Sequence, residues 1–239
     1  MCTVTVIPLE RQLIITMNRD EARSRTEGSP LEVSISEDHN CWYPIDSESG
    51  GTWAGINSFG IVALLLNRYQ EDNPLASHSR GEIIPIVLAA KNLKDLELLA
   101  KQLDWFKYKP CDLLVLNQHR WISISWDGLR FKLLSDEYDA PFMRTSSSKD
   151  LDKTSQWRLD EFCRFLDSQP SGPNTALDFH LSPCTHNQSL GVYMQRPERH
   201  TKSITQVHLS RDKILARYFS QDALTSGPDT NHWDVLWPI

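Results

Sequence analysis

MCTVTVIPLERQLIITMNRD, residues 1–20, predicts a β-hairpin at the start of the chain. Two runs rich in β-branched residues, Thr3–Ile7 and Gln12–Met17, flank a short polar turn. Antiparallel pairing across that turn brings residues 17–20 beside residue 2. The hairpin therefore places Cys2 next to an amide, a guanidinium and a carboxylate, which belong to Asn18, Arg19 and Asp20.

Cys2 has two interpretations. A neighbouring cation such as Arg19 favours the thiolate form of a cysteine. If Met1 is removed, Cys2 also carries the α-amine, whose reference pKa of roughly 7.7–8.0 suits a general base. Nucleophile and base then lie on one residue, as in an N-terminal nucleophile enzyme. The alternative is a small buried strand residue, followed by a solvated charge run at residues 18–21.

The bulk composition bounds the classes of function. The chain has 239 residues, 40% of them hydrophobic and 23% charged, which is ordinary for a globular protein with a substantial core. Its net charge of −6 argues against a general nucleic-acid binder, because such proteins carry a basic field. No linker divides the sequence, so we expect a single domain over residues 1–239.

The sequence also bears on location and redox state. No apolar run approaches the roughly 20 residues that span a bilayer, and charges from Glu10 onward interrupt any signal-peptide core. We therefore expect a cytoplasmic protein without a membrane span. The cysteines are odd in number and widely spaced, which predicts free thiols. They are Cys2, Cys41, Cys111, Cys163 and Cys184.

Periodicity predicts the remaining elements. Ser79 and Glu82 have capping-box spacing, which starts one helix, and a leucine stripe predicts a second over residues 93–103. A third helix is expected over residues 152–168, and Asp127-Gly128 predicts a hairpin. The stretch that follows Met17, to about residue 49, and the tail from residue 227 are predicted to be loops. The third helix is expected to bury Leu159, Phe162, Cys163 and Leu166, and a strand is expected at Ser189–Met194.

Antiparallel hairpins and grouped helices indicate an α+β layered fold rather than βαβ alternation. We expect the helices within residues 79–103 to pack on one sheet and the helix at residues 152–168 on another.

Five motifs follow one another within residues 1–82: MCTVTVIP, MNRDEARSR, GGTWAGIN, GIVALLLNR and SRGE. In this order they resemble the NRDE family, which includes the transport and Golgi organisation 2 proteins. DAPFMRTSSSKD at residues 139–150 and SPCTH at residues 182–186 continue the resemblance more weakly. The family's later glycine-threonine-arginine strand is altered here to YMQRPERHTKSIT, residues 193–205.

The chain is more distantly similar to choloylglycine hydrolases and penicillin V acylases. This resemblance implies a four-layer αββα sandwich of the N-terminal nucleophile hydrolase type, with mainly antiparallel sheets. It implies Cys2 as nucleophile, Asp20 as partner of the α-amine and Asn67 as oxyanion donor. Those hydrolases have an arginine where this chain has Met17. Arg19, two residues on, lies on the same strand face and is the candidate replacement, beside Asn18.

Candidate ligand-binding residues lie in the motifs that resemble the family: Trp53, Asn57 and Arg68. Trp53 suits an apolar wall for an acyl or aromatic ligand, although core packing is an equally good interpretation. His180, Cys184 and His186 have metal-ligand chemistry but lack a fourth ligand, and Pro183 interrupts them. We therefore expect no metal and no cofactor. A structural or ligand-pocket role for Cys184 and His186 fits the family motif better.

Two functions follow. The first is a hydrolase-like protein that acts on a non-peptide amide or acyl substrate through Cys2. The second is a non-catalytic cytosolic protein that binds or carries haem or acyl-CoA-type lipids, as the family resemblance implies. In either case the expected partner is a small acyl, amide or haem-like molecule.

Overall fold

The computed structural model describes residues 1–26, 28–168, 172–183, 190–226 and 232–238. The chain forms two compact units. The first comprises Met1–Arg25, Asp139–Ser210 and Leu215–Val235; the second comprises Thr26–Tyr138, Arg211–Ile214 and Leu236–Ile239. Within the described residues, no helix is both long enough and apolar enough to span a bilayer.

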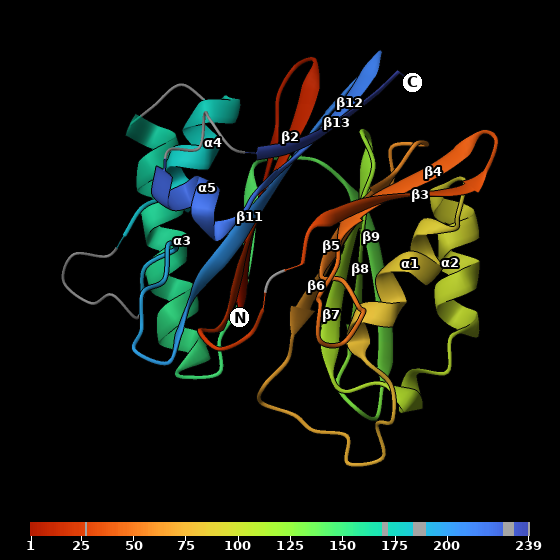
Figure 1. Ribbon diagram of the computed structural model, residues 1–239, viewed down its shortest axis with the longest axis horizontal. Coiled ribbons are helices and arrows are strands. Elements are labelled where there is room, and N and C mark those ends of the chain that lie inside the picture. The colour runs from red at the N-terminus through yellow and green to blue at the C-terminus, as the bar shows by residue number, and fades with distance from the viewer. Residues whose placement is uncertain (27, 169–171, 184–189, 227–231, 239) are drawn as a thin grey trace. The chain divides into compact units, whose positions relative to one another are not determined.

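A six-stranded sheet forms the centre of the first unit (Figure 1). The predicted N-terminal hairpin is confirmed, since its two strands pair antiparallel with Cys2 opposite Arg19. The turn is closed by the N–H of Leu9, which donates to the carbonyl of Gln12 at 2.8 Å. In sheet order the strands are β10 (Phe142–Ser146), β1 (Cys2–Pro8), β2 (Gln12–Ala22), β11 (Arg199–Ser210), β12 (Lys213–Phe219) and β13 (His232–Pro238).

Three helices accompany this sheet: α3 (Leu151–Ser168), α4 (Pro173–His180) and α5 (Gln221–Ser226). α3 contacts β10, α4 contacts β2 and α5 contacts β11. An apolar core lies between α3, α4 and the sheet, where Phe162 and Phe179 pack with Ile7 and Ile14. Burial of these side chains fixes the helices over the strands that carry Cys2 and Asp20.

The second unit contains a seven-stranded sheet. Its strands are β3 (Pro30–Ser36), β4 (His39–Pro44), β5 (Ala54–Asn57), β6 (Val62–Asn67), β7 (Cys111–Leu116), β8 (Arg120–Trp126) and β9 (Phe131–Glu137). α1 (Ile83–Leu88) packs on β5 and β6 and also contacts α2 (Leu93–Gln102). Short 3-10 turns, η1 (Arg80–Glu82) and η2 (Trp105–Lys107), adjoin these helices. The predicted capping box of Ser79 and Glu82 is present at η1.

The α+β class with mainly antiparallel sheets is thus confirmed. The predicted partition of the helices is also correct, since α1 and α3 contact strands of different sheets. The hairpin at Asp127-Gly128 joins β8 to β9, and Gly128 has a φ of +94°, which favours glycine.

Several expectations are wrong. Residues 30–44, read as a loop, form the paired strands β3 and β4. The tail includes β13 rather than loop alone. Residues 190–194 form no strand, and Ser189 lies outside the described residues.

The buried face of α3 also differs from the prediction. Leu159 and Cys163 are exposed, whereas Thr154, Arg158 and Phe162 are buried. The physical reason is Arg158, whose guanidinium has partners inside the first unit. The helix therefore turns a charged residue inward, which an apolar stripe does not anticipate.

Candidate active site at the start of the first strand

Cys2 lies between two strands. It pairs with Arg19 on β2 and with Ser146 on β10. Its main-chain N–H donates to Ser146 Oγ at 3.0 Å, and its carbonyl accepts from Thr145 Oγ1 at 3.1 Å. The predicted placement of Cys2 beside residues 17–20 is therefore confirmed.

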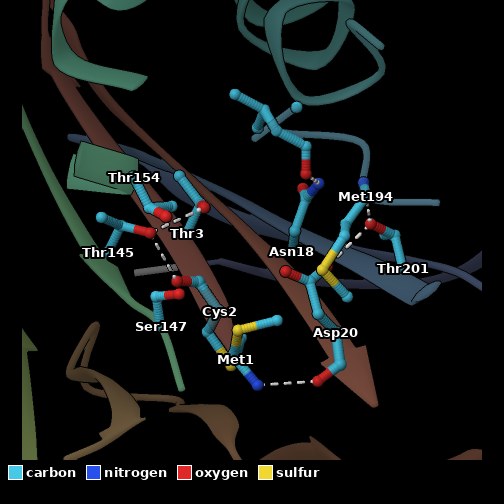
Figure 2. Close-up of polar contacts among 12 residues, drawn as sticks. Met1, Cys2, Thr3, Asn18, Asp20, Thr145, Ser147, Thr154, Met194 and Thr201 are labelled. Atoms are coloured by element: carbon cyan, nitrogen blue, oxygen red, sulfur yellow. Dashed lines mark hydrogen bonds between the residues drawn. The ribbon is translucent and has the colours of Figure 1, made fainter. Parts of the chain in front are cut away.

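Met1 continues the ladder between β1 and β2. Its ammonium donates to the Asp20 carbonyl at 2.8 Å, and its own carbonyl accepts from the Asp20 N–H at 2.7 Å. Figure 2 shows Met1, Cys2 and Asp20 together. The Met1 side chain is 1% exposed, and its sulfur lies 3.6 Å from Ser148 Oγ and 3.8 Å from Arg196 Nη1. With Met1 in place, the α-amine belongs to Met1 and the nitrogen of Cys2 is an amide.

Burial has the largest effect on the pKa of the Cys2 thiol. The side chain is buried, and this desolvation raises the pKa of Cys2 above its ordinary value. The N-terminal ammonium and Arg19 lower that pKa, whereas the charge of Asp20 raises it further. A reactive thiol is expected to be partly exposed, and for Cys2 this expectation is wrong, since its side chain is 6% exposed. The expectation that Arg19 favours the thiolate is outweighed by desolvation.

Asp20 is fully enclosed in the first unit. Its Oδ1 accepts from Thr201 Oγ1 at 2.7 Å, and its Oδ2 lies 4.0 Å from Arg158 Nη2. Desolvation raises the pKa of Asp20, while Arg158 and the N-terminal ammonium pull it down. Oδ2 has no hydrogen-bond partner among the described residues. One carboxylate oxygen thus remains able to accept a proton or a hydrogen bond.

Arg158 holds this region together. Its Nη1 donates to Thr3 Oγ1 at 2.6 Å and to Thr145 Oγ1 at 2.8 Å. Nε and Nη2 donate to the carbonyls of Leu190 and Gly191 at 3.0 and 2.9 Å. The guanidinium therefore joins α3 to β1 and β10 and supplies the counter-charge of Asp20.

Sequence reasoning missed Arg158 because a lone arginine within an amphipathic helix ordinarily faces solvent. It also missed Thr201, although a signal was present. The altered strand still reads His200-Thr201-Lys202, a threonine followed by a basic residue, and the threonine hydroxyl contacts Asp20.

Asn18 serves as a cross-link. Its amide nitrogen donates to the carbonyls of His180 and Val192, both at 2.9 Å. Its oxygen lies 2.6 Å from His180 Nδ1, and Thr5 Oγ1 lies 2.8 Å from His180 Nε2. Since an amide oxygen only accepts, His180 Nδ1 carries the proton and Nε2 accepts from Thr5. Each polar atom of the Asn18 side chain is used within the protein.

His180 is neutral in this arrangement. Burial lowers its pKa to about 3, and the positive charge of Arg158 acts in the same direction. Both ring nitrogens are hydrogen-bonded, so neither has a lone pair free for a metal. Cys184 and His186 lie outside the described residues. Among the residues that are described, no group of three or more His, Cys, Asp or Glu side chains is arranged to hold a metal ion.

The other candidate residues belong to the second unit. Asn57 donates to the carbonyls of Leu88 and Ala90 at 2.9 and 2.7 Å and accepts from two main-chain N–H groups, so its amide anchors the end of α1. Trp53 is buried.

At the end of β6, Asn67 Nδ2 donates to the Tyr69 hydroxyl at 3.2 Å. Arg68 next to it pairs with Glu71 and Asp112. The ligand-binding roles of Trp53, Asn57 and Arg68, and the oxyanion role of Asn67, stay predictions.

The thiols differ in burial. Among the described cysteines, Cys2, Cys41 and Cys111 are buried and Cys163 is exposed. The expectation that Cys163 is buried on the apolar stripe of α3 is therefore wrong. The neighbouring guanidinium of Arg19 predicts that Cys2 is the most reactive of the thiols, and this stays a prediction.

The profile of the Transport and Golgi organisation 2 family matches residues 1–153, well over half of the chain. The chain belongs to the Transport and Golgi organisation 2 family. The match covers every strand from β1 to β10, and it ends at the start of α3. Arg158 and Thr201 lie beyond it. No curated protein sequence matches this family member.

One solved structure supports the fold of this Transport and Golgi organisation 2 family member. A variant of conjugated bile acid hydrolase from Clostridium perfringens is similar with a TM-score of 0.56 at 10% identity, over 100% of this chain and 96% of that one. An N-acylethanolamine-hydrolyzing acid amidase orthologue from Caenorhabditis elegans has a TM-score of 0.48 at 14% identity, over 86% and 92%. The first likeness agrees with the predicted fold of the N-terminal nucleophile hydrolase type.

Proposed function

We propose that this protein, once Met1 has been removed, hydrolyses a linear amide or related acyl bond with Cys2 as the nucleophile. The observation that carries the proposal is the register of β1 and β2. It places Cys2 opposite Arg19, and the main chain of residue 1 is hydrogen-bonded to the main chain of Asp20. The fold shared with a bile acid hydrolase supports the class of reaction, at the level of fold alone.

The reaction has two stages. The Cys2 sulfur attacks the substrate carbonyl carbon while the thiol proton passes to the α-amine of Cys2. The tetrahedral intermediate collapses, the C–N bond breaks, and the α-ammonium returns the proton to the leaving amine. Water then attacks the thioester, which releases the carboxylic acid and regenerates the thiol.

Removal of Met1 changes the electrostatics of the site. The α-amine is then that of Cys2 itself, next to its thiol, and it becomes an ammonium when it takes the thiol proton. Charge attraction from this ammonium stabilises the thiolate, as the Met1 ammonium lowers the pKa of Cys2 when Met1 is present. Asp20, with an oxygen available, would accept a hydrogen bond from this ammonium, and Ser146 Oγ already lies 3.0 Å from the same nitrogen.

The role of Asn67 as an oxyanion donor stays a prediction of the family resemblance. A single donor of this kind contributes about 2.7–4 kcal/mol in a comparable enzyme. Asn18 and Arg158 are proposed as positioning residues, because their polar atoms bind other parts of the protein.

A second candidate function is a non-catalytic carrier of haem or acyl-CoA-type ligands. One observation favours it: with Met1 in place, burial raises the pKa of the Cys2 thiol, and the α-amine belongs to another residue. A carrier needs neither a thiolate nor a free amine at Cys2.

Turnover with and without Met1 separates the two functions. The full chain and a chain that begins at Cys2, released by cleaving an N-terminal fusion, are incubated with a panel of acyl p-nitroanilides. We expect release of p-nitroaniline only from the chain that begins at Cys2. Absence of turnover in both, combined with equal binding of haem or an acyl-CoA to both, would favour the carrier.

A further inference from the structure

Met1 is held as a complete amino-acid residue. Its ammonium donates to the Asp20 carbonyl at 2.8 Å, and its carbonyl accepts from the Asp20 N–H at 2.7 Å. Its side chain is buried, with Ser148 Oγ and Arg196 Nη1 as donors near the sulfur. The protein thus contacts the amine, the carbonyl and the unbranched side chain of residue 1.

The space that Met1 occupies already contains an acyl group, which is the methionyl group itself. The Met1 carbonyl carbon is bonded to the nitrogen of Cys2, the residue that carries the proposed nucleophile. The Asp20 N–H that binds the Met1 carbonyl also stabilises the Cys2 thiolate. The main chain of Asp20 thus binds the carbonyl of residue 1 and also lowers the pKa of Cys2.

Removal of Met1 takes a partner from both main-chain polar groups of Asp20. Buried main-chain groups are costly to leave unpaired, and Asp20 is 1% exposed. A ligand is therefore favoured if it returns both an N–H donor and a carbonyl acceptor with the spacing of an amino acid.

We propose that the space of Met1 is the acyl subsite and that it takes an L-α-aminoacyl group with an unbranched side chain; this rests on the proposed function. The substrate is then an L-aminoacyl amide. Its α-amine binds the Asp20 carbonyl, its carbonyl oxygen binds the Asp20 N–H, and its side chain lies near Arg196 and Ser148. The Cys2 sulfur displaces the amine, and water releases the free amino acid.

The space filled by the Met1 side chain determines which side chains of an aminoacyl group can bind. Methionine has no branch at Cβ, and protein interiors are packed too tightly to admit extra methyl groups without strain. A β-branched residue therefore fits poorly. A D-residue fits poorly as well, because it cannot keep both Asp20 contacts and place its side chain beside Arg196.

Binding of L-methioninamide tests this subsite without any turnover. The probe carries the amine, the carbonyl and the side chain of Met1, and a ligand that binds the folded state raises the unfolding midpoint. The chain that begins at Cys2 is compared with the full chain, where Met1 fills the site. We expect binding to the shorter chain alone, with affinity at least about tenfold weaker for D-methioninamide, L-valinamide and hexanamide.

Other results would overturn the subsite. These are equal binding to both chains, no binding to the chain that begins at Cys2, or equal affinity for the four amides. If the shorter chain folds only when L-methioninamide is added, the proposal is supported; if it fails to fold even then, residue 1 is a structural part of the strand and the proposal fails. Binding without turnover would instead leave the subsite intact and contradict the hydrolase function.

Discussion

Cys2→Ala, in the chain that begins at Cys2, should reduce amide turnover by on the order of a thousandfold or more. The thiol forms the C–S bond to the carbonyl carbon, which leads to cleavage of the C–N bond. No other described cysteine lies on β1 or β2. Ground-state affinity should change little, because the sulfur acts chiefly in the transition state. Initial rates with an aminoacyl p-nitroanilide, together with the affinity for L-methioninamide, measure the two effects separately.

Cys163→Ala is the matched control. Cys163 is exposed on α3, so its loss should leave the rate unchanged. A Cys2→Ala protein that keeps most of its turnover would show that another group performs the chemistry. A parallel loss of affinity would point to a binding role for the thiol.

Arg158→Leu should lower the free energy of unfolding by about 3–5 kcal/mol. The change leaves Asp20 as a buried charge without its nearest counter-ion, and it removes the donors that serve Thr3, Thr145 and two main-chain carbonyls. Urea unfolding, followed by circular dichroism, measures this loss.

Two further variants show whether the loss of stability comes from the ion pair with Asp20. Arg164→Leu on the same helix removes a largely exposed pair with Glu161 and should cost no more than about 1 kcal/mol. Adding Asp20→Asn to Arg158→Leu should cost less than the sum of the single changes, since the stranded charge disappears. A loss of below about 1 kcal/mol for Arg158→Leu, or full additivity with Asp20→Asn, contradicts the proposed ion pair.

Local chemistry determines much of this fold. The turn after Pro8 and the β-branched runs fix the register that sets Cys2 opposite Arg19. The capping box at Ser79 and the glycine turn at Gly128 likewise depend on near neighbours in the chain. These features are predictable because the interacting groups lie within a few residues of each other.

Long-range polar contacts are not predictable in this way. Arg158 and Thr201 reach Asp20 from positions more than a hundred residues away, and neither has a periodic signal. Asn18 and Asn57 resemble site residues because each lies within a family motif, yet their amides bind main-chain carbonyls. The sequence identifies which residues are polar, but not which distant residue each of them contacts in the folded chain.

Cys2, with a free α-amine, should form a covalent acyl-enzyme. The most direct test is the intact mass of the chain that begins at Cys2, acid-quenched within the first turnover of an L-methionyl p-nitroanilide. We expect a mass increase of one methionyl group that fragmentation assigns to residue 2 and that is absent from the Cys2→Ala variant. A chain that remains unmodified while p-nitroaniline is released, or one labelled at another residue, would contradict it.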